Sequence, residues 1–219
     1  MKFIKKVIRG NYTLFELSRE LYEFTRRRRG GVKIINKGCA KLEKNCIGDN
    51  NQVFIGAGSI LHATEIYIRG NNVNIKIGEN VIIGKRSSIR CEGDNISISI
   101  GDNTTMTRDV HICSQEEGTS ITIGNDCMFS NNIIVRTSDS HPIYGNTGER
   151  LNKAASVAIG NHVWIAPETT IMKGVIVGNN SILGSKSMVT KNIPNDCLAV
   201  GIPAKPVRYE VQWTREKLF

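Results

Sequence analysis

The stretch that decides the fold is IGNHVWIAPETTIMKGVIVGNNSILGSKSMV, residues 159–189. An isoleucine, valine or leucine returns at every sixth position of this stretch, and a compact or branched residue follows four positions after each one. The aliphatic positions are Ile159, Ile165, Ile171, Val177, Leu183 and Val189. A period of six fits neither the 3.6-residue turn of a helix nor the simple alternation of a half-buried strand. It predicts short strands joined at corners, three strands and about 18 residues to a coil, stacked as a β-solenoid.

The same ladder continues upstream with insertions. The segments that begin at Ile77, Ile100 and Ile123 resemble one another and recur at intervals of 23 residues. We interpret the extra residues, 95–99 and 118–122, as strand-like segments that bulge from a corner, and we expect coils from about residue 40 to about residue 200. Corners favour a left-handed backbone, which glycine and asparagine adopt at the least cost. Residues of these types occupy the expected corners: Asn80, Asn103, Gly174 and Asn180.

The first thirty residues differ in kind from the rest. Thr13-x-x-Glu16 is typical of a helix start, and the basic run 26–29 just before Gly30-Gly31 is typical of a helix end. We therefore expect a helical cap over residues 1–31, a β-helix domain over 32–208 with a protruding loop over 136–156, and a tail over 209–219. The cap would close the open end of the solenoid. Docking of its basic cluster to an anionic membrane is the alternative.

The 219 residues carry a formal net charge of +9. Because no aromatic platform or known motif accompanies this charge, we expect an anionic small molecule or a membrane surface as partner, and no nucleic acid. No stretch is apolar and long enough to cross a bilayer, and Met1–Lys6 lacks the apolar core of a signal peptide. The six cysteines have no metal-finger spacing. We expect a cytoplasmic protein with reduced thiols.

The ladder fails after Val135, since none of the next three expected positions holds a core aliphatic residue. Residues 136–156 should therefore leave the solenoid as a long loop, and such excursions from a rigid scaffold often carry function. His141 is the histidine at this exit. An imidazole that titrates near neutral pH suits a general base toward a hydroxyl or an amine. Asp139, two residues earlier, is the candidate acceptor that would orient His141.

Three segments carry a resemblance to a known family. They are residues 159–166, residues 189–194 and residues 199–208, and together with Ser140-His141-Pro142 they resemble hexapeptide-repeat O-acetyltransferases of the galactoside, maltose and Nod-factor type. The resemblance implies a left-handed parallel β-helix, a homotrimer, acetyl-coenzyme A as cosubstrate and no metal. It also implies that His141 is the catalytic histidine. By position, the residues implied to line the coenzyme channel are Trp164, Ala166, Ser185, Thr190, Lys191 and Arg208.

The acceptor side departs from that family. Sugar acetyltransferases of this type carry an asparagine in the coil before the catalytic one, where this chain has Thr107, with Asp109 two residues on. The residues that we expect to contact the acceptor are Asp109, Asn131, Asn132 and Tyr144.

The expected function is acetyl transfer from coenzyme A to a hydroxyl of a sugar or surface-polysaccharide precursor. Transfer to the nitrogen of an amino sugar or nucleotide sugar is the close alternative. Two other classes are a metal-dependent carbonic-anhydrase-like solenoid and a non-catalytic solenoid. The first needs three histidines shared between subunits, for which only the scattered His111, His141 and His162 are available. A non-catalytic solenoid would not explain why the chain carries the long loop.

Overall fold

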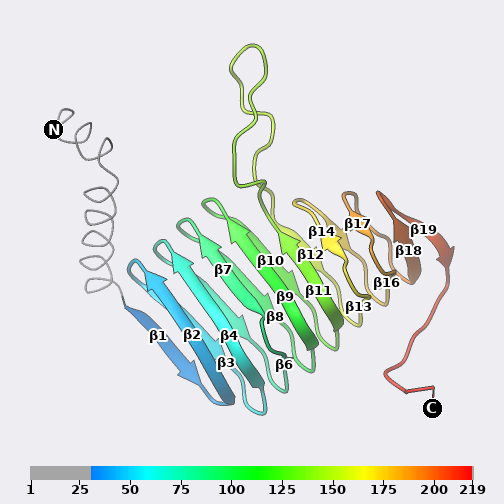
Figure 1. Ribbon diagram of the computed structural model, residues 1–219, viewed down its shortest axis with the longest axis horizontal. Coiled ribbons are helices and arrows are strands. Elements are labelled where there is room, and N and C mark those ends of the chain that lie inside the picture. The colour runs from blue at the N-terminus through cyan, green and yellow to red at the C-terminus, as the bar shows by residue number, and fades with distance from the viewer. Residues whose placement is uncertain (1–30, 219) are drawn as a thin grey trace.

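The computed structural model describes residues 31–218 of the chain, and these residues form a β-solenoid with three walls (Figure 1). The first wall is a parallel sheet of seven strands within the described residues. Its strands, in spatial order, are β1 (Val32–Asn36), β3 (Asn51–Ile55), β5 (Asn74–Ile77), β8 (Ser97–Ile100), β10 (Ser120–Ile123), β12 (Val157–Ile159) and β15 (Ile176–Val177).

The second and third walls share long strands that bend around their common corner. These long strands are β2 (Cys39–Ile47), β4 (Ile60–Arg69), β9 (Thr105–Gln115) and β11 (Met128–Arg136). Short strands complete the second wall: β6 (Ile82–Ile83), β13 (Trp164–Ile165), β16 (Ile182–Leu183) and β18 (Cys197–Gly201). Others complete the third: β7 (Ser88–Glu92), β14 (Thr170–Ile171) and β17 (Met188–Val189). The last strand, β19 (Ala204–Tyr209), pairs antiparallel with β18.

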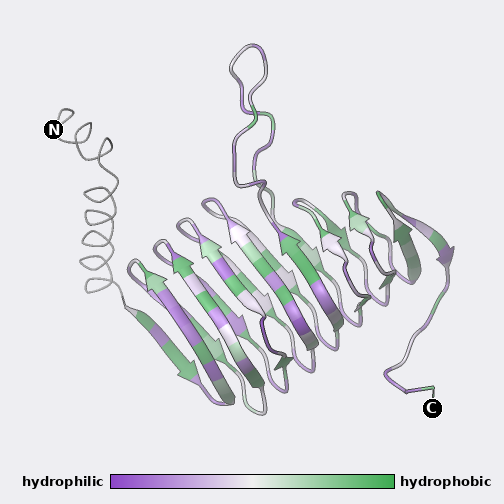
Figure 2. Ribbon diagram, viewed as in Figure 1, coloured by the Kyte–Doolittle hydropathy of each residue, from purple (hydrophilic) through white to green (hydrophobic). Residues whose placement is uncertain are grey.

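The core is a stack of aliphatic columns inside the three walls. Ile77, Ile100 and Ile123 face one another in register on the first wall, and each is at most 2% exposed. Figure 2 shows hydrophobic and hydrophilic segments alternating along the walls. Fully burying one such side chain contributes about 1.5–3 kcal/mol, so the hexad ladder is the main source of the fold's stability. The expected corner residues also have a left-handed backbone, with φ between 55° and 75° at Asn80, Asn103, Gly174 and Asn180.

The interpretation of the 23-residue coils needs a correction. Residues 95–99 and 118–122 do not bulge from the solenoid. Ile98 and Ile121 are buried and in register with each other, because β8 and β10 belong to the first wall. The extra residues instead lengthen the first and third walls, which makes these coils wider. The coils also begin earlier than residue 40, since β1 already pairs with β3.

The expected N-terminal helix falls on residues 1–30 and lies outside the described residues. Within the described part of the chain, no helix is long and apolar enough to cross a membrane. All six cysteines are free thiols. The handedness of the coil stays a prediction.

Candidate active site

The loop that interrupts the ladder leaves the corner between the third and first walls. β11 ends at Arg136 and β12 begins at Val157, and the chain between them projects from the solenoid (Figure 1). The preceding coils turn at this corner through short tight segments, such as Gly93-Asp94-Asn95. The loop therefore replaces a corner and leaves the walls intact.

Buried polar groups hold the base of the loop. Thr137 and Ser138 are both 0% exposed. The Thr137 hydroxyl accepts a hydrogen bond from the Gln115 backbone N–H at 2.8 Å, and the Ser138 hydroxyl donates one to Glu116 Oε1 at 2.6 Å. Both guanidinium NH2 nitrogens of Arg150, on the returning side of the loop, donate to the Glu116 carboxylate at 2.6 and 2.7 Å. One carboxylate from the coil below thus joins the two sides of the loop.

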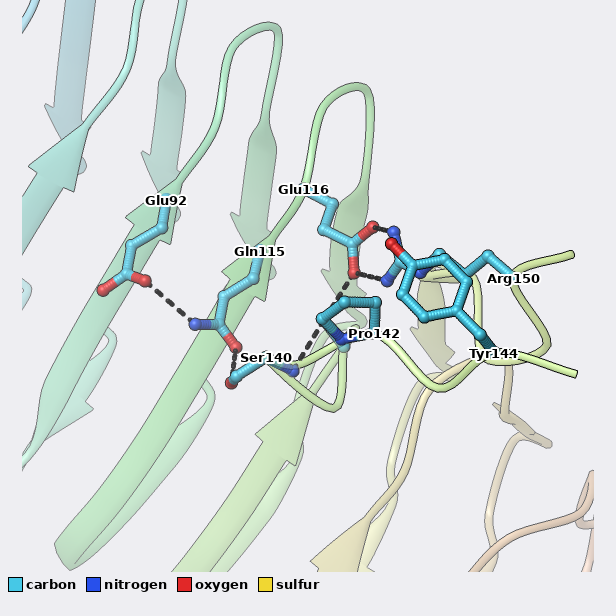
Figure 3. A pocket seen from close by; sticks show the side chains of 8 residues that line it. Glu92, Gln115, Glu116, Ser140, Pro142, Tyr144 and Arg150 are labelled. Carbon is cyan, nitrogen blue, oxygen red and sulfur yellow. Dashed lines mark hydrogen bonds and ion pairs between the residues drawn. The ribbon is translucent and has the colours of Figure 1, made fainter. Parts of the chain in front are cut away.

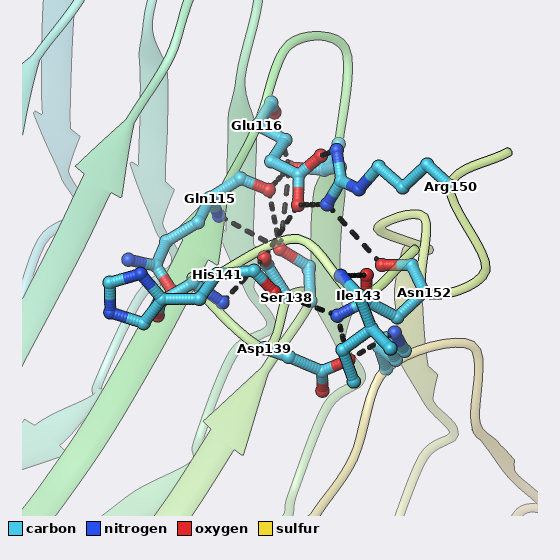
Figure 4. Close-up of polar contacts among 12 residues, drawn as sticks. Gln115, Glu116, Ser138, Asp139, His141, Ile143, Arg150 and Asn152 are labelled. Atoms are coloured by element: carbon cyan, nitrogen blue, oxygen red, sulfur yellow. Dashed lines mark hydrogen bonds and ion pairs between the residues drawn. The ribbon is translucent and has the colours of Figure 1, made fainter. Parts of the chain in front are cut away.

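Asn152 organises the segment around His141 (Figure 4). It is 8% exposed, its Oδ1 accepts from the Ile143 N–H at 2.6 Å, and its Nδ2 donates to the His141 carbonyl at 2.8 Å. The same Nδ2 lies 2.9 Å from Asp139 Oδ2, to which Lys173 Nζ also donates at 2.5 Å. Asn152 therefore fixes the backbone from the His141 carbonyl to the Ile143 N–H.

The ion pairs at the loop lower the pKa of two carboxyl groups. Hydrogen bonds from Arg150 hold the pKa of Glu116 below its ordinary value of 4.5, and the Lys173 ammonium, followed by Asn152, lowers that of Asp139 from 3.8. Both carboxyl groups are charged over the range in which proteins usually work, because opposite charges and donors favour the ionised form. The loop is thus held by charge-assisted hydrogen bonds, which are stronger than neutral ones.

The expectation that Asp139 orients His141 is not met. Figure 4 shows the imidazole pointing away from the Asp139 carboxylate, which is occupied by Lys173 and Asn152. Among the described residues, none hydrogen-bonds to the His141 ring, and the side chain is exposed. Asp139 thus acts on the backbone that carries His141, while the ring nitrogens stay available to a ligand.

A polar cleft opens at the base of the loop (Figure 3). His141 itself is not among the residues that line it. The volume of the cleft is about 340 Å³ and its lining includes Ser140 and Pro142, the two neighbours of His141, together with Tyr144 from the loop. Gln115 spans its floor, since its Oε1 accepts from the Ser140 hydroxyl at 3.0 Å and its Nε2 donates to Glu92 at 3.0 Å. Hydroxyl, amide and carboxylate groups around an open cleft suit a ligand rich in hydroxyls.

Of the four residues expected to contact the acceptor, the structure brings only Tyr144 to this cleft. Asp109 and Asn132 lie at the corner between the second and third walls, with φ of 53° and 57°. There Asp109 forms a two-pronged ion pair with Arg86, at 2.6 and 2.7 Å, and Asn131 pairs with the neighbouring Arg108. Within the described chain these three residues are therefore separate from the loop.

The six residues expected to line the coenzyme channel divide among three places. Trp164 lies on the second wall, where strand pairing aligns it in turn with Ile182, Leu198 and Arg208. Ala166, which is buried, and Ser185, which is exposed, lie at successive coils of the corner between the second and third walls. Thr190 and Lys191 follow β17, and the pairing of β14 with β17 places Lys191 one coil beyond Lys173. Lys191 thus shares a corner with the loop of His141, and Arg208 does not.

The C-terminal tail returns across the outside of the coils, which the sequence did not indicate. The Trp213 ring stacks on His162 with centroids 4.1 Å apart and donates a hydrogen bond to the His162 carbonyl. Arg215 donates to Asp126 at 2.7 Å and to Thr105 at 2.9 Å. Trp213 also lies 6.0 Å from Trp164, so the tail covers part of the second wall. Sequence reasoning also missed five polar residues of the site, because no local pattern marks them: Gln115, Glu116, Arg150, Asn152 and Lys173.

Comparison with known proteins agrees with this architecture. Residues 156–191 match the family of bacterial transferase hexapeptide repeats (six repeats). The chain is 37% identical over 129 residues to a polysialic acid O-acetyltransferase of Neisseria meningitidis, a match that covers 58% of each chain. It is 44% identical over 52 residues to the galactoside O-acetyltransferase of Escherichia coli K12, covering 24% of this chain and 26% of that protein.

Two solved structures resemble the whole solenoid. The polysialic acid O-acetyltransferase OatWY is 33% identical, with a TM-score of 0.77 over 85% of this chain and 88% of its own. The polysialic acid-specific acetyltransferase NeuO is 29% identical, with a TM-score of 0.56 over 86% and 90%. The fold and its loop define an acyltransferase of the solenoid class. The chain belongs to the hexapeptide-repeat acetyltransferase family. Its sequence matches span only 29% and 58% of the first two curated relatives, both polysialic acid O-acetyltransferases.

Replacing Asn152 by Ala should loosen the segment around His141. The substitution removes the acceptor of the part-buried Ile143 N–H, and a hydrogen bond of this kind contributes about 0.5–1.5 kcal/mol. We expect the Ile143 amide to exchange hydrogen roughly 2- to 12-fold faster, measured by NMR, while the core strands keep their protection. The exposed Asn146→Ala is the matched control. Unchanged exchange at Ile143 would show that Asn152 does not hold the segment.

The brace between Glu116 and Arg150 should weaken in acid. Because the folded pKa of Glu116 is lowered, the stabilisation is complete above the ordinary value of 4.5 and is lost as the pH falls through the folded pKa. We expect limited proteolysis of the loop to be constant above pH 5 and to accelerate below about pH 4.5. Glu116→Gln should be cleaved faster at neutral pH and should lose this pH dependence. A variant that keeps the dependence would assign it to another group.

Proposed function

We propose that this protein transfers the acetyl group of acetyl-coenzyme A to a sugar hydroxyl of a surface polysaccharide or its precursor, with His141 as the general base. The observation that carries the proposal is an exposed imidazole without an intramolecular partner among the described residues, held by a braced loop at the edge of a polar cleft. Family membership supports the acyl chemistry. The relatives named as polysialic acid and galactoside O-acetyltransferases support a sugar hydroxyl as the acceptor.

The proposed chemistry is a direct transfer between two bound substrates. His141 removes the proton of the acceptor hydroxyl as its oxygen attacks the thioester carbonyl, and a tetrahedral intermediate forms. Backbone N–H groups at the groove between subunits stabilise the negative oxygen. The C–S bond then breaks, and the imidazolium returns the proton to the departing coenzyme A thiolate. The braces from Asn152 and Glu116 matter here because a general base must keep hydrogen-bonding distance to the oxygen that it deprotonates.

The proposed coenzyme channel uses Trp164, Ala166, Ser185, Thr190, Lys191 and Arg208. The donor set fits a ligand that carries several phosphates, because Lys191 and Arg208 are exposed cations that form no ion pair within residues 31–218. The two cations lie on different sides of one solenoid. One coenzyme A molecule would contact both when they come from neighbouring subunits, which supports the proposed homotrimer. The proposal also includes a left-handed coil and a cytoplasmic location. Contact of the basic run 26–29 with an anionic membrane is the alternative to a capping role for the N-terminal segment.

The test of the base is His141→Ala. A general base contributes about 10²–10⁴ in rate, so turnover should fall by that factor while the melting temperature stays the same, since an exposed side chain supports little packing. The control is His62→Ala, another exposed histidine, which should keep full turnover. Turnover is measured as free thiol released from acetyl-coenzyme A with a panel of sugars and amino sugars. A folded His141→Ala protein with near-normal turnover would exclude His141 as the base.

The test of the channel is a pair of single substitutions, Lys191→Ala and Arg208→Ala. Each removes one charge-assisted contact, worth about 1.5–3 kcal/mol, so the KM for acetyl-coenzyme A should rise roughly 10- to 100-fold with less effect on kcat. Lys205→Ala, an exposed cation on the same last strand as Arg208, is the control. An unchanged KM in both variants would place the channel elsewhere.

A further inference from the structure

A second cleft opens on the third wall, away from the loop. Its volume is about 400 Å³ and its lining includes Glu65 of β4, Ser88 of β7 and His111 of β9. The Ser88 hydroxyl and His111 Nδ1 are 2.8 Å apart, which fixes the plane of the imidazole. None of the predicted site residues lines this cleft.

The two clefts lie on the same pair of strands. β7 and β9 pair in register, so the second cleft begins at Ser88 and His111 and the loop cleft ends at Glu92 and Gln115. Figure 3 shows the loop cleft running from Tyr144 and Arg150 to Glu92 on the neighbouring coil. Ser88 and Glu92 are four residue steps apart along β7, a distance of roughly 13 Å. That distance is longer than a single sugar ring.

Arg90 fills the interval between the clefts. Its guanidinium lies 3.8 Å from Glu65 of the second cleft and 3.3 Å from Glu92 of the loop cleft. It also lies 4.2 Å from the centroid of the Tyr67 ring, a cation–π contact that holds it against the wall. One half-exposed cation thus lies between the two clefts and forms an ion pair with a carboxylate of each.

The charges along the two clefts and the interval between them are balanced. The carboxylates of Glu43, Glu65, Glu92 and Glu116 are matched in number by the cations of Lys85, Arg86, Arg90 and Arg150. Because these charges cancel, a run of anionic sugars gains no net electrostatic attraction here. The hydroxyls of neutral sugars can instead donate to the carboxylates and accept from the guanidinium groups.

We infer that the third wall binds the acceptor as an extended oligosaccharide of neutral sugars, with one end at His141 and the chain continuing over Arg90 to the Ser88–His111 cleft. The inference rests on the proposed function, because the loop cleft is where the acceptor hydroxyl would react. In this arrangement Arg90 and His111 determine which chains bind, and neither touches the reacting atoms.

The experiment compares chain lengths and charges. Binding of the full chain to an array of neutral oligosaccharides of increasing length, and of sialic acid oligomers of the same lengths, is followed by acetyl-transfer kinetics with the sugars that bind. We expect neutral chains long enough to cover both clefts to bind at least about tenfold more tightly than monosaccharides. Arg90→Ala and His111→Ala should each remove most of that gain, with no change in the KM for acetyl-coenzyme A or in turnover of short acceptors.

Lys76→Ala, an exposed cation on the first wall, is the control and should leave all three quantities unchanged. Equal affinity for short and long chains, a preference for sialic acid oligomers, unaffected variants, or no binding to any oligosaccharide by the folded protein would each overturn the inference. The proposed function fails separately, if no sugar of any length accepts an acetyl group. Acetyl transfer to short sugars without a length effect would leave the proposed function standing and the extended site refuted.

Discussion

No coil of this protein can satisfy its own backbone. The N–H groups of one coil donate to the carbonyls of the next, as Gly56 does to Ile77 and Gly78 to Ile100, so each coil exists only against its neighbours. At the corners the coils approach so closely that a Cβ atom on Gly70 would lie 1.9 Å from the Gly93 carbonyl oxygen. Side chains continue the same stacking, since the amide of Asn71 donates to Asp94 in the coil above. The spacing of the coils is therefore set by the backbone, and every other feature adapts to it.

The loop of His141 does not take part in this stacking, so side chains from the coils must hold it in place. The projecting part of this loop is not stacked between two coils, and an unbraced loop would place His141 in many positions. Asn152, Glu116 and Lys173 supply the missing partners, each from a different direction. The stacked coils are rigid, and a few polar residues connect them to the loop. The residue proposed to act as base is thereby held in position.

The sequence predicted those features that repeat. The hexad aliphatics are buried, and the corner residues have positive φ, because one residue type per coil meets the same environment each time. Prediction from the sequence failed for residues whose structural environment occurs only once in the chain. The alternating stretch around Ile98 looked like a bulge, although it is a lengthened wall, since alternation alone does not tell which sheet a strand joins. Asp139 was close to His141 in sequence, but Lys173, 34 residues away, competes for its carboxylate. Contacts of that kind follow from the tertiary structure and leave no local pattern.

The tail has a consequence for how the chain reaches its final form. Arg215 bonds to Asp126, to Thr105 and to the carbonyl of Asn103, groups that precede it by about half of the chain. During synthesis the coils around Thr105 can form as soon as they emerge, whereas these bonds need a residue that is made 89 to 112 positions later. Folding of this part is thus directional, because the tail can fasten onto the middle coils only after they have formed. A chain cut short before Arg215 would keep its coils and lose these bonds.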